Sequence, residues 1–328
     1  GGCRLGARPI DRIIDGVRQL NADIDYDSND GFFHAGTTGL RGMDYTFEKN
    51  THMGTETLII AAVLAEGTTI LRNAAEEPEI NDLITLLCDM GAEVKRSNTR
   101  EITIKGVEKL HGAEFTISPD RNEIITWAIA GIITGGDVTV KDAQLADLSA
   151  FLEKLDEANG GYEKTDTGIR FFAKDSLKAV DVTTSIYPGF MTDWQAPWAV
   201  LMTQALGTSI IHETVFENKM GYIKDLKKMG AKAELFNPNP DNPEDVYNFN
   251  LADDSPSYFH AVRITGPSKL HNAIVTMLDI RAGAAVVLAA LAASGQTVIH
   301  GIHLVDRGYE KFEERLTSIG AQIERRDE

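Results

Sequence analysis

Apolar residues recur every three or four positions in several segments of the chain, with polar residues between them. In one segment the apolar positions are Ile80, Leu83, Ile84, Leu87 and Met90. This spacing predicts an amphipathic helix with one face against a core. The same spacing predicts helices over residues 13–20, 148–155, 223–229 and 309–319.

A small residue follows each of these helices and precedes a short strand. Gly and Asn readily take the left-handed conformation that ends a helix. The intervals between the small residues are 70, 69, 70 and 90 residues, which indicates a unit repeated about every 70 residues. The long last interval predicts an inserted loop over the proline-rich residues 237–257. The small residues are Asn21, Gly91, Gly160, Gly230 and Gly320.

A second kind of helix is predicted in each repeat. Residues 58–65, 124–133, 199–206 and 282–293 are apolar on nearly every side, which is typical of a helix buried all round. One unit therefore runs strand, buried helix, strand, surface helix, strand, strand, and the last strand of the chain is expected at residues 321–324. Buried helices enclosed by sheets predict an α/β fold made of inside-out barrels.

The repeats also predict the domains. The chain enters its first repeat just before the surface helix, so we expect the first domain, residues 1–117, to be incomplete. Three full repeats follow and predict a second domain over residues 118–328.

Composition narrows the class of protein. The chain has 328 residues, 43% of them hydrophobic, and a net charge of −17, which disfavours a surface that wraps nucleic acid. We find no apolar run long enough to span a membrane and no secretory signal, so we expect no membrane partner. Two cysteines make no disulfide framework and favour the cytoplasm.

Polar residues stand where the buried helices are predicted to begin. They are Thr55, Asp120, Asp193 and Asp279, and each could bind a ligand or simply cap its helix. Arg281 is different, because an arginine in the first turn opposes the helix dipole. Binding a substrate carboxylate or phosphate would explain it.

Three further segments carry candidate groups. The glycine-rich residues 1–9 place Cys3 near Arg4 and Arg8, which favours a reactive thiolate, although a bystander cysteine in a flexible terminus is the alternative. Cys88 is predicted to be a core residue. Residues 214–219 and 306–309 each follow a predicted strand and are expected to open a surface helix. Their basic groups could face a site, or each segment could simply be the solvated start of a helix.

Several runs of the sequence together resemble the enolpyruvyl transferase family, in particular its UDP-N-acetylglucosamine branch. The runs are GGCRLGARPID at residues 1–11, LAEGTT and PEI at 64–69 and 78–80, PDRNE at 119–123, PGFMTDWQA at 188–196, ETVFENK at 213–219, DIRAGAAVVL at 279–288 and VDRGYE at 305–310. The resemblance implies two inside-out α/β domains with the active site between them. It also implies transfer of the enolpyruvyl group of phosphoenolpyruvate to the 3-hydroxyl of UDP-N-acetylglucosamine, the first committed step of peptidoglycan synthesis.

The resemblance implies roles for individual residues. Cys3 would add to phosphoenolpyruvate or act as general acid and would be the site of fosfomycin alkylation, and Asp193 would take the proton of the sugar hydroxyl. Arg281 and Arg307 would hold the carboxylate and phosphate of phosphoenolpyruvate. The other implied substrate-binding residues are Arg8, Pro9, Ile10, Asp11, Lys49, Thr51, His52, Gly54, Asp120, Phe216, Lys219 and Asp279. The chemistry needs an acid, a base and fixed cations, and no metal or cofactor is expected.

The chain departs from the family pattern at several points. Lys219 stands where the family usually has arginine, and a point charge lacks the bidentate geometry of a guanidinium. Arg12 and Ile13 and the run Thr51-His52-Met53-Gly54 are also unusual. The chain is roughly 110 residues short of six repeats, a part that would hold a lysine of the site, so we expect little turnover from this chain alone. The alternatives are transfer to shikimate 3-phosphate and a non-catalytic protein that binds nucleotide sugars or anions.

Overall fold

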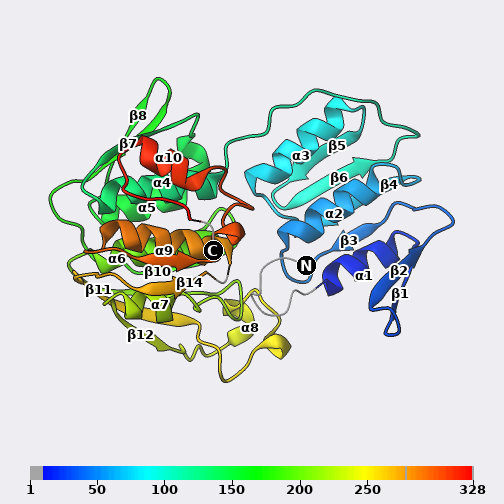
Figure 1. Cartoon of the computed structure of the whole chain (residues 1–328). Helices are drawn as coiled ribbons and strands as arrows, with labels where there is room; N and C mark the ends of the chain where they lie inside the picture. The colour runs from blue at the N-terminus through cyan, green and yellow to red at the C-terminus, as the bar shows by residue number, and fades with distance from the viewer. Residues whose placement is uncertain (1–9, 278, 327–328) are drawn as a thin grey trace. The chain divides into compact units, whose positions relative to one another are not determined.

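The computed structural model describes residues 10–277 and 279–326, which divide into two compact units (Figure 1). One unit ends at Ser118 and the other begins at Pro119. Each unit has its own hydrophobic core.

The unit that ends at Ser118 contains a four-stranded sheet and a separate hairpin. The order in the sheet is β3-β4-β6-β5, with β3 and β4 parallel and the other pairs antiparallel. β1 and β2 form the hairpin. The helices of this unit are α1 (Asp11–Gln19), α2 (His52–Ala62) and α3 (Pro78–Asp89). Its strands are β1 (Asp23–Asp27), β2 (Phe32–Gly36), β3 (Asp44–Thr46), β4 (Thr68–Arg72), β5 (Glu93–Asn98) and β6 (Glu101–Lys105).

The unit that begins at Pro119 contains three sheets. Their strand orders are β7-β9-β8, β10-β11-β13-β12 and β14-β15. The helices are α4 (Arg121–Ile133), α5 (Ser149–Glu157), α6 (Gln195–Thr203), α7 (Ile223–Lys228), α8 (Pro243–Val246), α9 (Ile280–Ala292) and α10 (Phe312–Ser318), with 3₁₀ turns η1 (Leu145–Leu148), η2 (Thr192–Trp194), η3 (Leu251–Asp253) and η4 (Ile302–Leu304). The strands are β7 (Asp137–Lys141), β8 (Gly161–Thr165), β9 (Gly168–Phe172), β10 (Val182–Thr183), β11 (Gly207–His212), β12 (Lys232–Phe236), β13 (Ala261–Gly266), β14 (Ile274–Thr276) and β15 (Val298–His300).

The predicted repeat is visible in the two four-stranded sheets. In each sheet, two strands that are joined by a helix lie parallel to each other, β3 and β4 in one sheet and β10 and β11 in the other. Two further strands, which pair antiparallel, complete the sheet. Four of the five helix ends follow the sequence pattern, because a positive φ occurs at Asn21, Gly91, Gly230 and Gly320. In the third repeat the prediction of Gly160 is wrong by one position, because the residue with a positive φ is Asn159.

Three helices form the core of the unit that begins at Pro119. α4, α6 and α9 contact one another and lie side by side, and the sheets lie outside them (Figure 1). Every residue of α6 is buried, which its apolar sequence requires. The inside-out α/β arrangement is therefore confirmed here.

The prediction of a helix buried on every side is wrong for α2. Ile60 and Leu64 are 57% and 55% exposed. α2 packs against the amphipathic helices α1 and α3 and against β6, which leaves the side chain of Ile60 exposed. The helix also begins at His52, with Thr51 as its N-cap, rather than near Thr55.

Other local predictions were wrong as well. Residues 321–324 form no strand, since no described strand pairs with them, although Ala321 and Ile323 pack on a core cluster. Cys88 is exposed, because the neighbouring Leu87 takes the inward position on α3. The expected inserted loop joins β12 to β13, where the equivalent strands β5 and β6 are joined by a tight turn.

Candidate active site

A carboxylate and an ammonium group pair at one end of α6. Asp193 lies in η2, just before α6, and Lys219 lies in the loop between β11 and α7. The Lys219 Nζ donates to the Asp193 Oδ1 at 2.5 Å. The Lys219 side chain is 8% exposed and that of Asp193 is 32% exposed, so the pair is open to solvent on the Asp193 side. The Phe216 ring lies 4.6 Å from the same Nζ.

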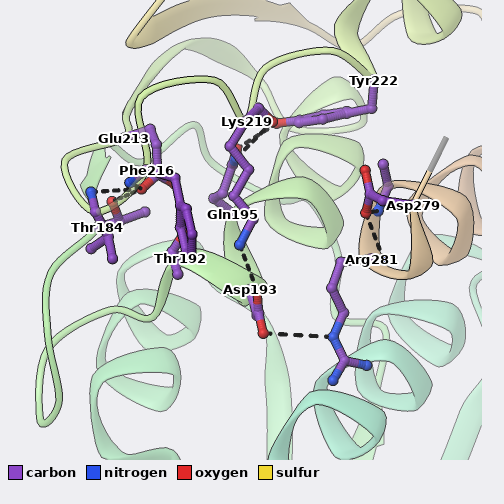
Figure 2. Close-up of polar contacts among 12 residues, drawn as sticks. Thr184, Thr192, Asp193, Gln195, Glu213, Phe216, Lys219, Tyr222, Asp279 and Arg281 are labelled. Carbon is purple, nitrogen blue, oxygen red and sulfur yellow. Dashed lines mark hydrogen bonds and ion pairs between the residues drawn. The ribbon is translucent and has the colours of Figure 1, made fainter. Parts of the chain in front are cut away.

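Arg281, in the first turn of α9, brings a second cation to Asp193 (Figure 2). Its Nε lies 3.7 Å from the Asp193 Oδ2, and its Nη2 lies 3.8 Å from the Asp120 Oδ2. Its guanidinium also lies 5.4 Å from the centre of the Tyr309 ring. The Nη1 is buried and has no hydrogen-bond partner within the described ranges. This guanidinium therefore retains an N–H group that could donate a hydrogen bond to a bound anion.

Asp120 and Asp279, two predicted site residues near Arg281, act as helix caps. Asp120 accepts from the Asn122 backbone N at 2.7 Å, and Asp279 accepts from the backbone N of Arg281 and of Ala282 at 2.9 Å each. Asp279 thus holds the turn that carries Arg281. Asp193 does not have this role, because α6 has Trp194 at its cap position with no side-chain cap bond.

The two cations determine the protonation of Asp193. Burial raises the pKa of the carboxyl group, but Lys219 and Arg281 together lower it more, and the pKa falls to about 2. Burial lowers the pKa of Arg281, while Tyr309, Asp193 and Asp120 raise it to a value above that of a free arginine. At neutral pH the site therefore holds an ionised acid between two cations.

Several buried polar groups support this cluster and were not predicted from the sequence. The Tyr222 hydroxyl donates to the Gln195 Oε1 at 2.7 Å, and the Gln195 Nε2 donates to the Lys219 carbonyl at 3.3 Å. Tyr309 shares a 2.8 Å hydrogen bond with Thr126. The available sequence signal was a glutamine at the start of an otherwise apolar helix.

A cavity of about 110 Å³ opens beside Lys219. Tyr222, Asp225, Thr276 and Asp279 contribute polar groups to its lining. It lies on the side of Lys219 that faces α9, within the unit that begins at Pro119.

Lys49, Thr51, His52 and Gly54 lie in the unit that ends at Ser118. Lys49 is half-buried between β3 and α2. Thr51 accepts from the Gly54 backbone N at 3.2 Å, and the His52 Nε2 lies 3.3 Å from Glu56. A Cβ on Gly54 would lie 2.4 Å from the Thr51 Cγ2, so this glycine is needed for the cap itself. The structure thus gives Thr51 and Gly54 a local structural role.

The remaining predicted residues are placed as follows. Ile10 and Asp11 are exposed at the start of α1, whereas Cys3, Arg8 and Pro9 lie outside the described residues. Arg307 is exposed between η4 and α10, and α7 begins only at Ile223, so neither basic segment opens a helix as predicted. None of the described helices is long and apolar enough to cross a membrane.

Comparison with known proteins identifies relatives along the whole chain. A sequence model of the family described as EPSP synthase (3-phosphoshikimate 1-carboxyvinyltransferase) matches residues 1–316. The UDP-N-acetylglucosamine 1-carboxyvinyltransferase of Acidobacterium capsulatum is 43% identical over 99% of this chain and 69% of its own length. The protein of the same name from Bdellovibrio bacteriovorus is 44% identical over 99% of this chain and 73% of its own length.

Solved structures share the fold. The enolpyruvyl transferase NikO from Streptomyces tendae matches 98% of this chain and 73% of its own chain, with a TM-score of 0.84 and 23% identity. The EPSP synthase of Acinetobacter baumannii matches 98% of this chain with a TM-score of 0.68 and 20% identity. By the family match and by relatives more than 40% identical, this chain belongs to the enolpyruvyl transferase family.

Proposed function

We propose that this chain transfers the enolpyruvyl group of phosphoenolpyruvate to the 3-hydroxyl of UDP-N-acetylglucosamine, in peptidoglycan synthesis. The observation that carries the proposal is the Asp193 carboxylate held between Lys219 and Arg281. The names of the relatives at 43% and 44% identity support the nucleotide sugar as acceptor. Both substrates are soluble anions, and the reaction belongs in the cytoplasm.

The reaction would use these groups in two stages. In the addition, the acceptor oxygen bonds to C2 of phosphoenolpyruvate, its proton passes to Asp193, and a general acid delivers a proton to C3. In the elimination, the C2–O bond to phosphate breaks and the methyl carbon returns a proton to the conjugate base of the general acid, which restores the double bond. Inorganic phosphate leaves with both electrons of the broken bond.

Two positive charges favour the binding of phosphoenolpyruvate beside Asp193. The buried Nη1 of Arg281 offers an unused donor, and Lys219 offers a compact charge that is nearly enclosed by protein. When an anion binds between them, each cation is shared with the substrate. The carboxylate then loses part of its stabilisation, which makes it a better base at the moment of reaction.

Arg307, Lys49, Asp120, Phe216 and the residues near the N-terminus are proposed as further substrate-binding groups. Cys3 is proposed as the general acid, or as a nucleophile that adds to phosphoenolpyruvate. These assignments depend on the family motifs in the sequence.

The choice of acceptor gives the direct test of the proposal. Phosphate release from phosphoenolpyruvate is measured with UDP-N-acetylglucosamine or with shikimate 3-phosphate, with the purified protein. We expect release with the nucleotide sugar and at least a hundredfold less with shikimate 3-phosphate, since a site built for one polar acceptor rejects another. Release only with shikimate 3-phosphate would contradict the proposal. Binding of the nucleotide sugar without release would indicate the non-catalytic alternative.

A further inference from the structure

Glu213 is an acid that the proposed chemistry does not use, yet it is completely buried. It follows β11 directly, and its exposed fraction is 0%. Burial of a carboxyl group is unfavourable unless hydrogen bonds replace its lost hydration. The partners of this side chain therefore indicate what it does.

Four donors converge on the Glu213 carboxylate, among them Thr184, Thr192 and Phe216, which Figure 2 labels. The hydroxyls of Thr184 and Thr192 donate at 3.0 and 2.8 Å, to Oε1 and Oε2 respectively. The backbone N groups of Val215 and Phe216 donate to Oε1 at 2.8 and 3.0 Å. Both carboxylate oxygens are thus satisfied by hydrogen bonds alone.

These four donors belong to three different segments. Thr184 follows β10, which pairs in parallel with β11, so the ends of both strands meet at one edge. Thr192 directly precedes Asp193, and Phe216 lies in the loop that carries Lys219. One side chain therefore joins the segment of the proposed base to the segment of its cationic partner.

We propose that Glu213 is a positioning residue that sets the distance between Asp193 and Lys219 through its bonds to Thr192 and to the loop at Phe216. This inference rests on the proposed function of Asp193 as base. A displacement of about 1 Å in such a pair can cost on the order of a hundredfold in rate. Glu213 does not touch the substrate in this account and acts only through the residues that it holds.

The link through Thr192 can be cut without a large change of shape. Thr192→Val removes the hydroxyl, and Thr192→Ser retains it. Thr203→Val is the matched control, because the Thr203 hydroxyl donates to the Val200 carbonyl at 2.6 Å in the last turn of α6, away from Asp193. Glu213→Gln tests the other end of the link, alone and combined with Thr192→Val.

Steady-state kinetics of the purified protein and its variants give the first measurement. We expect Thr192→Val to lower kcat about tenfold with KM for phosphoenolpyruvate changed less than about twofold, and Thr192→Ser to restore kcat. The Glu213→Gln, Thr192→Val double variant should be no slower than the slower single variant, because residues that act through one link are not additive. Thr203→Val should leave kcat unchanged.

Three results would overturn the inference. They are a Thr192→Val variant as active as the Thr203→Val control, a Thr192→Ser variant as slow as Thr192→Val, and additive losses in the double variant. Absence of turnover in the wild-type protein would instead contradict the proposed function and would leave the positioning role of Glu213 to be tested separately. In that case the crystal structure of Thr192→Val decides the inference: a longer distance between the Asp193 carboxylate and the Lys219 Nζ supports it, and an unchanged 2.5 Å contact overturns it.

Discussion

Asp193 and Lys219 are separated by 26 positions in the sequence and are joined by a 2.5 Å hydrogen bond between oppositely charged groups. Asp193 precedes a fully buried helix, and Lys219 lies in a loop whose backbone is bonded to Gln195 and, through Glu213, to Thr192. The protein therefore fixes the position of Asp193 through the buried helix that follows it, and that of Lys219 through the hydrogen bonds of its loop. The predictions below concern what this pair and its neighbours do.

Removal of the Lys219 charge should slow the reaction. In Lys219→Met the apolar side chain of methionine can still pack against the Phe216 ring, while the ammonium group is lost. We expect kcat/KM for phosphoenolpyruvate to fall on the order of a hundredfold, as when one fixed donor to a developing charge is removed. Lys219→Arg should retain much more activity, and Lys228→Met, which removes an exposed lysine paired with Asp225, is the control. Equal activity of Lys219→Met and Lys228→Met would argue against any role of this charge.

Arg281 should be needed for its geometry as well as its charge. Its Nε and Nη2 face two different carboxylates from one rigid planar group, a geometry that the compact ammonium of lysine does not reproduce. Arg281→Lys is therefore expected to raise KM for phosphoenolpyruvate about tenfold or more. Arg315→Lys is a matched control, because Arg315 also pairs with an acid, Glu123, and lies over an aromatic ring. A normal KM in Arg281→Lys would show that a single positive charge is sufficient.

The pH dependence of stability should report the Asp193 pair. The folded protein holds the pKa of Asp193 at about 2, against about 3.9 in an unfolded chain. A carboxyl group with a lowered pKa stabilises the fold at pH values above its unfolded pKa, and this contribution is lost as the pH falls through the folded value. The wild-type Tm should therefore exceed that of Asp193→Asn by a constant amount above about pH 5, and the difference should shrink towards pH 2. A difference that grows on acidification would contradict the assignment.

Gly54 gives a test that separates a structural role from a binding role. A Cβ at this position would meet the stiff Thr51 side chain at 2.4 Å, so Gly54→Ala should lower the free energy of unfolding by about 1–3 kcal/mol. Gly36→Ala is the control, because no atom outside the glycine's neighbours lies within 4 Å of a Cβ there. Denaturant unfolding of both variants measures the effect. An unchanged stability in Gly54→Ala, with weaker binding of UDP-N-acetylglucosamine, would favour the binding role that the sequence motif implied.

The repeated architecture could be predicted because its signals are local. A residue with a left-handed backbone conformation follows each surface helix, as at Gly91 and Gly230. The core helices carry an almost continuous apolar sequence, as in α6. The exposure of Ile60 in α2 and of Leu64 just after it could not be predicted, because both are apolar and only the neighbouring elements decide whether they are covered. The absent strand at residues 321–324 has the same cause, since a strand requires a partner.

The candidate site was predictable only in part. Asp193, Lys219 and Arg281 were indicated by motifs, and Arg281 also by its unfavourable place in a first turn. Glu213 stands in the same run, ETVFENK at residues 213–219, but nothing in that run indicated a role for it, because an acid before a threonine and a valine looks like the exposed start of a helix. Its burial arises from the meeting of three distant segments, which no single stretch of sequence reveals.

The most direct test of the account is the turnover of the purified Asp193→Asn variant. Asparagine keeps the size of the side chain but cannot take the proton of the acceptor hydroxyl. The account predicts that phosphate release with phosphoenolpyruvate and UDP-N-acetylglucosamine falls at least a hundredfold, while the Kd for UDP-N-acetylglucosamine changes less than about threefold. Near-normal phosphate release by Asp193→Asn would contradict the central claim that this carboxylate is the base of the reaction.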